Sequence, residues 1–280
     1  YLSDQQRRDV LASTQIASGQ AFSNGYARLN LMDAADGYGS FTGTVTVTMD
    51  ATRGGLNAFD VWRNDISGPG GLTKAGTGQL VLTGQNSYAG GTNVREGVLT
   101  TWAGGLGAGV VTNDAVLELA QSVDGTLTNR LEGGGLLRKT GAGLLDLAGT
   151  GGFSGRAAIE GGGLQLDGNL PAMRIEAATG TTISGDGSAR SLRLAGGATL
   201  SQGGASGTLT LLGDLVLAPG SSYVATLAAN SAAPLTQVGG TATIDGAALR
   251  VVQGDRLASL TGIPLIGGEV AGRFASVAGN

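Results

Sequence analysis

Residues 70–84 read Gly-Gly-Leu-Thr-Lys-Ala-Gly-Thr-Gly-Gln-Leu-Val-Leu-Thr-Gly, and residues 134–149 repeat the arrangement as Gly-Gly-Leu-Leu-Arg-Lys-Thr-Gly-Ala-Gly-Leu-Leu-Asp-Leu-Ala-Gly. The match continues downstream, where Tyr88-Ala89-Gly90 corresponds to Phe153-Ser154-Gly155 and Gly97-Val98-Leu99 to Gly162-Gly163-Leu164. Weaker copies follow at residues 213–220 and 239–249. Internal repetition over short intervals is typical of solenoids, in which each repeat buries its apolar face against its neighbours.

Short alternating segments lie between the glycines, and they predict strands. The segments are Val45–Met49, Leu80–Leu82, Ala115–Leu119, Leu164–Leu166, Ser191–Leu194 and Leu215–Leu217. Each segment offers only two or three apolar side chains to one face, so a single strand cannot bury a core. Stacking equivalent strands about 4.8 Å apart joins these faces into one interior. The sequence therefore predicts an all-β, right-handed parallel β-helix over residues 41–280, with coils of roughly 20 residues. A β-sandwich or a closed barrel is the alternative, although such folds usually show clearer hairpins and more Tyr and Trp.

Residues 1–40 have a different pattern. Ser3 is a predicted N-cap, Gln6 completes a capping box, and Gly19 is a possible end of this helix. A second short helix is predicted over residues 29–35 and ends near Gly37. We expect residues 1–40 to form the helical tail of an upstream domain.

The composition of the sequence excludes several classes of protein. Its 280 residues include 53 glycines, no cysteine and no histidine, and the formal net charge is −4. The absence of cysteine excludes a disulfide framework. Because histidine is absent as well, the sequence lacks the usual ligands for zinc and most transition metals. The Lys and Arg residues are scattered along the sequence, so no nucleic acid is expected as a partner. The sequence contains no run of 18 apolar residues, so it predicts no membrane-spanning helix. The first residues do not resemble a signal peptide, which suggests a fragment of a longer precursor.

Acidic residues and lysines are the remaining candidates for a site. Asp33 and Asp36 could share a helix face, but solvated charges at a helix end are the simpler interpretation. Asp50, Asp60 and Asp65 lie near Trp62 in the sequence. A glycan-cleaving site could use the acids Glu118, Asp146, Glu160 and Asp167. Gly185-Asp186-Gly187 is similar to a calcium-binding repeat, and Lys74 and Lys139 are the candidate bases for Ser-Lys catalysis. A Trp beside acids can mark a sugar site, whereas a Trp at the first coil more often covers the open apolar end of a solenoid. The prediction is that no catalytic, cofactor-binding or metal-binding residue is present, and no cofactor is expected.

Residues 70–99 resemble the passenger-associated transport repeat of autotransporters. Residues 134–164 resemble a degenerate copy of this repeat, in which Phe153 replaces the tyrosine found at Tyr88. Gly272-Arg273-Phe274-Ala275-Ser276-Val277 is similar to the close of such passengers. Residues 1–14 and 25–31 look like the end of the acid-phosphatase module of phosphatidic-acid-phosphatase-type autotransporters. Residues 45–68 look like the junction into the stalk, although subtilase autotransporters have a similar junction.

The resemblance implies that residues 41–280 form a structural stalk that displays an upstream domain and assists its secretion, with residues 206–280 as a C-terminal folding nucleus. It implies a location at the cell surface or outside the cell, at a Gram-negative outer membrane, and the protein's own translocation barrel as a partner. Any phosphatase or protease activity would belong to the upstream domain. The alternatives are an adhesin or glycan-binding module with a host surface or glycan as its partner, and a glycan-cleaving β-helix enzyme.

Overall fold

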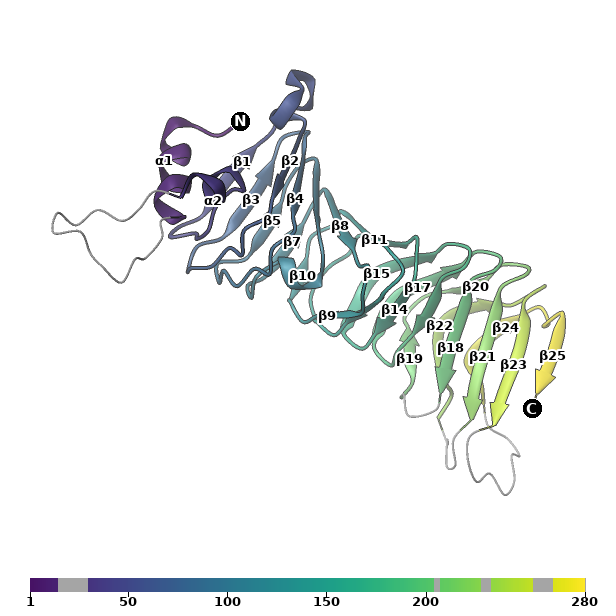
Figure 1. Cartoon of the computed structure of the whole chain (residues 1–280). Helices are drawn as coiled ribbons and strands as arrows, with labels where there is room; N and C mark the ends of the chain where they lie inside the picture. The colour runs from purple at the N-terminus through teal and green to yellow at the C-terminus, as the bar shows by residue number, and fades with distance from the viewer. Residues whose placement is uncertain (15–29, 204–206, 228–232, 254–263, 280) are drawn as a thin grey trace. The chain divides into compact units, whose positions relative to one another are not determined.

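The protein is a parallel β-solenoid, as the computed structural model shows (Figure 1). The structure describes residues 1–14, 30–203, 207–227, 233–253 and 264–279. Two compact units divide the chain, Tyr1–Leu119 and Ala120–Asn280. The predicted parallel β-helix is confirmed, and the prediction that residues 1–40 belong to an upstream domain remains a prediction.

In the first unit, strands pair in parallel in two sheets. One sheet contains β1 (Val45–Thr48), β3 (Leu72–Ala75), β5 (Thr92–Val94) and β7 (Val111–Asn113). The other contains β2 (Phe59–Trp62), β4 (Gln79–Leu82), β6 (Val98–Thr101) and β8 (Val116–Ala120). Phe59 pairs with Gln79, and Gln79 pairs with Val98, so each pairing advances the chain by one coil of the predicted length.

The second unit has the same design. One sheet contains β11 (Leu136–Thr140), β13 (Arg156–Ile159), β15 (Asn169–Ala177), β17 (Ser188–Leu194), β19 (Leu209–Leu211), β20 (Leu215–Leu217), β22 (Thr236–Thr243) and β24 (Ile266–Ala271). The other contains β9 (Gly125–Leu127), β12 (Leu144–Leu147), β14 (Gly163–Leu166), β16 (Thr182–Ser184), β18 (Thr199–Gly203), β21 (Ser222–Leu227), β23 (Ala248–Gln253) and β25 (Ser276–Gly279). A further short strand is β10 (Leu131–Glu132).

Coil length changes along the second unit. Arg174 pairs with Ser191, which is a shorter step than in the first unit, whereas Leu215 pairs with Ala242 and Ala242 with Val270, which are longer steps. The predicted coil length of roughly 20 residues therefore does not hold throughout this unit. The strands are also longer than predicted in places, up to nine residues in β15. A solenoid tolerates both changes because each coil needs only its pairing segments to match those of its neighbours.

The interior consists of columns of aliphatic side chains in register. In the first unit, Leu80, Leu99 and Leu117 are stacked partners of β4, β6 and β8, and each is fully buried. A comparable column in the second unit runs through Leu145, Leu164, Ile183 and Leu200. Alternate side chains of each strand point outward, as the period of two requires.

The N-terminal helices lie beside the first strands in Figure 1. Helix α1 (Asp4–Ser13) begins at the predicted capping box, because the Ser3 side chain accepts a hydrogen bond from the Gln6 amide and the Gln6 side chain accepts one from the Ser3 amide. The helix ends at Ser13, so its predicted extension toward Gly19 is wrong; Gly19 itself lies outside the described residues. Helix α2 (Leu31–Ala35) confirms the second helix, and Leu29 lies outside the described residues.

Beyond Gly39, the described part of the chain contains only 3-10 turns among its helices, namely η1 (Ala51–Arg53), η2 (Gly55–Asn57) and η3 (Ala103–Gly105). No helix among the described residues is long and apolar enough to span a membrane.

Candidate functional site

Trp62, at the end of β2, lies under the N-terminal helices and is only 2% exposed. Its ring packs on Tyr38, Tyr38 packs on Phe41, and Phe41 packs on Tyr88, with ring centroids 5.2–5.4 Å apart. A Cβ on Gly37 would lie 2.5 Å from the Trp62 ring, so only glycine fits there. This aromatic row continues from the end of the solenoid into its interior, and it supports a covering role for Trp62 rather than a sugar-binding platform.

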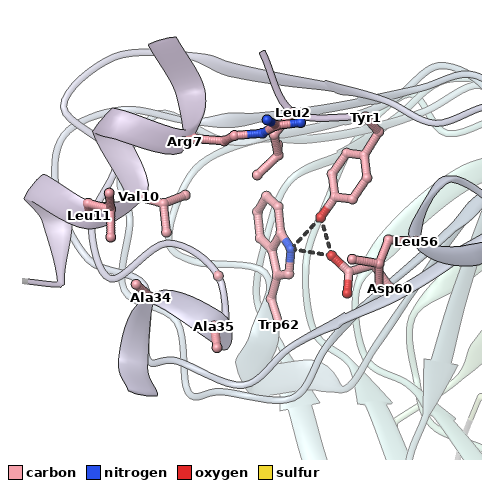
Figure 2. A pocket seen from close by; sticks show the side chains of 11 residues that line it. Tyr1, Leu2, Arg7, Val10, Leu11, Ala34, Ala35, Leu56, Asp60 and Trp62 are labelled. Carbon is pink, nitrogen blue, oxygen red and sulfur yellow. Dashed lines mark hydrogen bonds between the residues drawn. The ribbon is translucent and has the colours of Figure 1, made fainter. Parts of the chain in front are cut away.

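The nearest carboxylate to Trp62 is already engaged (Figure 2). The Trp62 indole N–H lies 3.0 Å from Asp60 Oδ2 and 2.9 Å from the Tyr1 hydroxyl, and the Tyr1 hydroxyl donates to Asp60. The Val61 amide donates to the other Asp60 oxygen at 2.8 Å. Burial, followed by the hydrogen bond to Asp60, raises the pKa of Tyr1 above its ordinary value. Since both Asp60 oxygens accept hydrogen bonds, Asp60 is poorly placed to act as a base.

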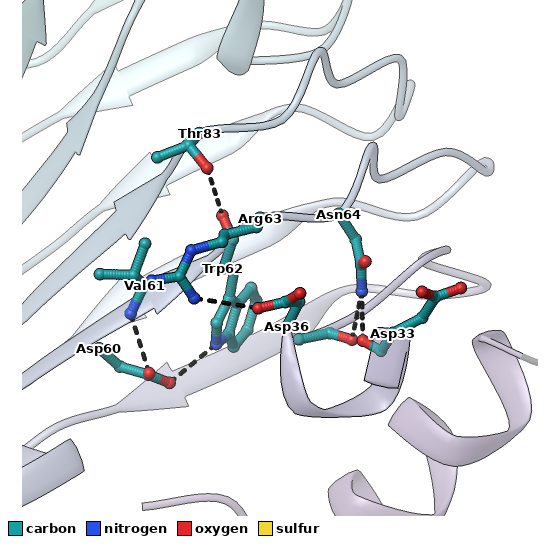
Figure 3. A network of polar contacts seen from close by, with 9 residues as sticks. Asp33, Asp36, Asp60, Val61, Trp62, Arg63, Asn64 and Thr83 are labelled. Atoms are coloured by element: carbon teal, nitrogen blue, oxygen red, sulfur yellow. Dashed lines mark hydrogen bonds and ion pairs between the residues drawn. The ribbon is translucent and has the colours of Figure 1, made fainter. Parts of the chain in front are cut away.

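The other acids near Trp62 each hold a different piece of main chain or side chain (Figure 3). Asp36 forms an ion pair with Arg63 at 3.0 Å, and the Asn64 side chain donates to the Asp33 carbonyl at 2.7 Å. Asp65 accepts from the Gln85 amide at 2.7 Å. Asp50 caps η1, and its hydrogen bonds with Thr52 lower its pKa. The structure therefore does not assemble Asp33, Asp36, Asp50, Asp60 and Asp65 into one constellation.

A pocket of about 520 Å³ opens beside Trp62 (Figure 2). Its lining is mainly apolar and comes from the N-terminal segment, α1, α2, η2 and β2: Tyr1, Leu2, Arg7, Val10, Leu11, Ala34, Ala35, Gly37, Leu56, Asp60 and Trp62. The only carboxylate in this lining is Asp60, whose oxygens are engaged as described above. The pocket thus has no second acid for general acid–base chemistry.

The acids of the later coils are only partly brought together. Asp146 is the register partner of Gln165, whose side chain donates to Asp167 at 2.5 Å, so Asp146 and Asp167 lie on adjacent coils. Burial raises the pKa of Asp146, and the Asp167 carboxylate adds to this effect. Glu160 instead forms an ion pair with Arg138 at 3.4 Å on the other sheet.

Glu118 lies in β8, in the first unit. Asp186 accepts from the Gly207 amide at 3.1 Å, which is a turn contact. Among the described residues, no group of three or more Asp and Glu residues could hold a metal ion.

Lys74 has the most unusual environment among these candidates. It is completely buried in β3, and its ammonium donates to the carbonyl oxygens of Ala75 (3.0 Å), Gly76 (2.7 Å) and Glu96 (3.1 Å). Ala75 ends β3 and Gly76 follows it, whereas Glu96 belongs to the next coil, after β5. The Glu96 carboxylate also accepts from the Gly76 amide at 2.9 Å. Burial lowers the pKa of Lys74 to about 8, while the Glu96 charge acts in the opposite direction.

Lys139 repeats this arrangement in the second unit. It is completely buried in β11, and its ammonium donates to the carbonyls of Gly141 (2.7 Å), Gly143 and Gly161 (2.8 Å). Gly161 again belongs to the following coil, after β13. Burial lowers the pKa of Lys139 from its ordinary value. We call each ammonium with its three carbonyls a lysine clamp, because it joins the turns of two successive coils.

Glycine makes both clamps possible. Gly76 has φ +70° and Gly141 has φ +80°, a region that favours glycine. A Cβ on Gly76 would lie 2.1 Å from the Met49 carbonyl oxygen, and one on Gly141 would lie 2.4 Å from the Gln121 carbonyl oxygen. In both copies the lysine stands two positions before this glycine. The tight turn therefore directs its carbonyls toward the buried ammonium.

From the sequence, Lys74 and Lys139 are considered only as Ser-Lys bases. The available signal was that the only two lysines of the chain occupy the same repeat position. Buried cations are rare unless they are paired or fully hydrogen-bonded, so this coincidence could have predicted a shared set of acceptors.

Comparison with known proteins identifies the repeats. The passenger-associated-transport-repeat family matches residues 72–100 and 137–166, and these two segments contain the two lysine clamps. An extracellular serine protease of Serratia marcescens is 62% identical over 42 residues, which cover 15% of this chain and 4% of that protein. Adhesin BmaC autotransporter of Brucella suis biovar 1 (strain 1330) is 35% identical over 163 residues, covering 49% of this chain and 5% of that protein.

The matched part of the chain thus spans no more than 5% of the length of these relatives. Each matched repeat contains adjacent strands of the solenoid and the turns between them, so the family match and the observed fold support the same interpretation. The location that follows is the cell surface, or the surroundings, of a Gram-negative bacterium. The chain is therefore an autotransporter passenger segment, a parallel β-solenoid with two passenger-associated transport repeats.

Proposed function

We propose that this solenoid is a rigid stalk that displays an upstream domain at the outer membrane and assists its secretion by folding coil by coil outside the cell. The lysine clamp is the observation that carries this proposal. The lysine of each repeat, Lys74 or Lys139, points inward and joins two coils. This lysine therefore supports assembly of the solenoid rather than ligand binding.

The clamp links folding of one coil to arrival of the next. Until Gly76 and Glu96 are both in place, the Lys74 ammonium lacks two of its three carbonyl acceptors and remains in water. The coil that follows in sequence supplies the third acceptor, so each newly added coil is fixed by the more C-terminal coil that has already folded. A chain that leaves a pore in an unfolded state would then be held outside by each newly clamped coil. Residues 206–280 are proposed to begin this process.

The test is secretion of the full-length protein by bacterial cells. The double variant Lys74→Met/Lys139→Met should place several-fold less passenger on the surface, measured by accessibility to added protease. The control is Arg53→Met/Arg250→Met, which removes two exposed cations and should leave secretion unchanged. Normal surface display of the lysine variant, with the purified chain shown to be destabilised, would contradict the secretion role.

The upstream domain is proposed to carry any catalytic activity, and the solenoid none. A protease is the better-supported cargo, because the Serratia marcescens relatives are named extracellular serine proteases. An acid phosphatase has no comparable support among these relatives. Purified residues 1–280 should hydrolyse neither a peptide substrate nor a phosphate ester, and turnover of either by the purified chain would overturn this assignment. The protein's own translocation barrel is proposed as its partner during export, and no nucleic acid is proposed.

A binding role is the second candidate function, and it is favoured because the Brucella suis relative is named an adhesin. Attachment of the purified chain to host cells would support this role. The stalk and adhesin roles are compatible, since a display column can also present a binding face.

A further inference from the structure

We infer that the outer face of β13, β15 and β17 is a binding groove for a linear polysaccharide that carries carboxylate groups. Arginines that are scattered in the sequence meet on this face. Arg156 is the register partner of Arg174, and Arg193 is the register partner of Glu176 on the same sheet. All four of these side chains are exposed. The inference does not rest on the proposed stalk role.

The face is hollowed where small residues follow each other from coil to coil. A groove of about 590 Å³ is lined by two arginines, Arg156 and Arg193, by two acids, Glu160 and Glu176, and otherwise by small and apolar residues, mainly alanines. The Glu160 carboxylate is paired with Arg138 at 3.4 Å, outside the groove lining. Ala178, Ala195 and Ala218 occupy corresponding corners of successive coils. Arg156, Glu176 and Arg193 come from three successive strands of the sheet, and neighbouring strands lie about 4.8 Å apart, so the groove runs across the strands. This geometry fits a repeating polymer better than a compact ligand.

The guanidinium groups are available for an incoming anion. Arg156 is paired with Glu176 at 2.8 Å, but both side chains are about half exposed, so this ion pair is weak and can be exchanged. Arg193 forms no ion pair within the described part of the chain. A planar guanidinium binds a carboxylate through two parallel N–H donors, which matches a uronic acid group.

Other polymers fit the groove less well. β13, β15 and β17 are internal strands with hydrogen-bonded neighbours on both sides, so a peptide cannot bind them by strand addition. The groove has no aromatic lining on which a neutral sugar could stack. The net charge of −4 opposes double-stranded nucleic acid, which carries one negative charge for about every 1.7 Å of its axis. A carboxylated polysaccharide, with one modest charge for each acidic sugar, is the chemistry that remains.

The experiment is titration of the full chain, residues 1–280, into fluorescein-labelled oligogalacturonate, followed by fluorescence anisotropy at low salt. Arg156→Gln/Arg193→Gln should weaken binding about tenfold, as expected for the loss of two exposed charge contacts. Glu176→Gln should strengthen binding about threefold, because it releases Arg156 and removes a repelling charge. A gain of binding cannot result from misfolding, so this variant keeps the test decisive.

Matched controls separate the groove from overall charge. Arg53→Gln/Arg250→Gln and Glu269→Gln make the same charge changes at exposed positions outside the groove, and they should change the affinity less than twofold. Unaltered binding by the double arginine variant, or equal effects in the controls, would overturn the site. Displacement of the probe by poly-glutamate as efficiently as by unlabelled oligogalacturonate would overturn the polysaccharide assignment.

Discussion

Lys74 and Lys139 are the only lysines of the chain, and neither exposes its ammonium to water. A buried cation usually costs several kcal/mol unless hydrogen bonds replace its hydration. Here three carbonyl oxygens surround each ammonium. The same carbonyls lie at tight turns, and those of Ala75 and Gly143 also accept main-chain amides, from Met49 at 3.0 Å and from Gly163 at 3.5 Å. The ammonium and the turn therefore stabilise each other.

Replacement of Lys74 by methionine keeps the aliphatic stem and removes the three donors. We expect Lys74→Met to lower the free energy of unfolding by about 2–4 kcal/mol, because buried acceptors lose a charged partner. Urea denaturation followed by tryptophan fluorescence measures this change. Arg53→Met, at an exposed position in η1, is the control, and a loss below about 0.5 kcal/mol for Lys74→Met would refute the clamp.

The lowered pKa of Lys74 predicts a pH dependence. The folded-state pKa of about 8 lies below the unfolded value of about 10.4, so between these values the unfolded chain binds more protons. The free energy of unfolding therefore rises with pH across this window. The stability difference between wild type and Lys74→Met should grow by about 1–2 kcal/mol from about pH 7.5 to about pH 9.5. Buried tyrosines such as Tyr88, whose pKa is raised to about 12, cancel in this difference.

A difference that stays constant or shrinks over this pH range would show that Lys74 keeps its proton in the folded state. The three carbonyl contacts would then outweigh burial, and the clamp would hold an ammonium throughout the window.

At the scale of the element, the turn after β3 depends on glycine for two separate reasons. Gly76 needs a positive φ, and it also leaves room for the Met49 carbonyl. Gly180 has a similar φ of +80°, but a Cβ there would meet nothing within 4 Å. We expect Gly180→Ala to cost about 1 kcal/mol, from φ alone. Gly76→Ala should cost at least about 3 kcal/mol, from φ and the main-chain collision together.

Urea midpoints of the two variants test this separation. Equal losses would show that the turn yields easily to an added methyl group and that close packing between coils contributes little.

The elements themselves were largely predictable. Leu80–Leu82 and Leu164–Leu166 alternate clearly, and both lie in strands of the structure. The Ser3 capping box also has a local signal, since its two partners are close in sequence. Helix α1 nevertheless ends before Gly19, at Ser13, whose side chain accepts from the Gly39 amide at 3.1 Å. That contact joins two segments far apart in the sequence, so no local pattern could have revealed it.

At the scale of the whole molecule, tryptophan fluorescence reports the unfolding of only one of the two units. Trp62 and Trp102 are the only tryptophans, and both lie in Tyr1–Leu119. Because a solenoid is stabilised by contacts between neighbouring coils, a local defect should act mainly on its own unit. Gly141→Ala should therefore lower the unfolding midpoint seen by circular dichroism and leave the tryptophan midpoint nearly unchanged. Gly76→Ala should shift the tryptophan midpoint.

Coincident shifts of both signals in both variants would contradict this prediction and would indicate a single cooperative transition.

The groove of the second unit is the feature that the sequence concealed. Its lining residues Arg156, Glu176 and Arg193 come from three successive coils, and they appear scattered along the chain. Their alignment depends on the register of each coil, including the irregular pairing within β15 and β17. A repeat pattern predicts that coils stack, but it does not predict which outward side chains become neighbours. The fold could therefore be predicted from the sequence, whereas the grouping of charged side chains on its surface could not.

The burial of both lysines has a consequence for chemical labelling. An amine-acylating reagent finds no lysine target on the folded solenoid, so each acylated lysine records an event in which a coil opened. Mass spectrometry of the two peptides, one from each unit, would give the opening rate of each unit separately. Applied to living cells, brief pulses of the reagent would mark passengers caught before their coils closed. The two side chains would thus report the interval between emergence of the chain and its folding.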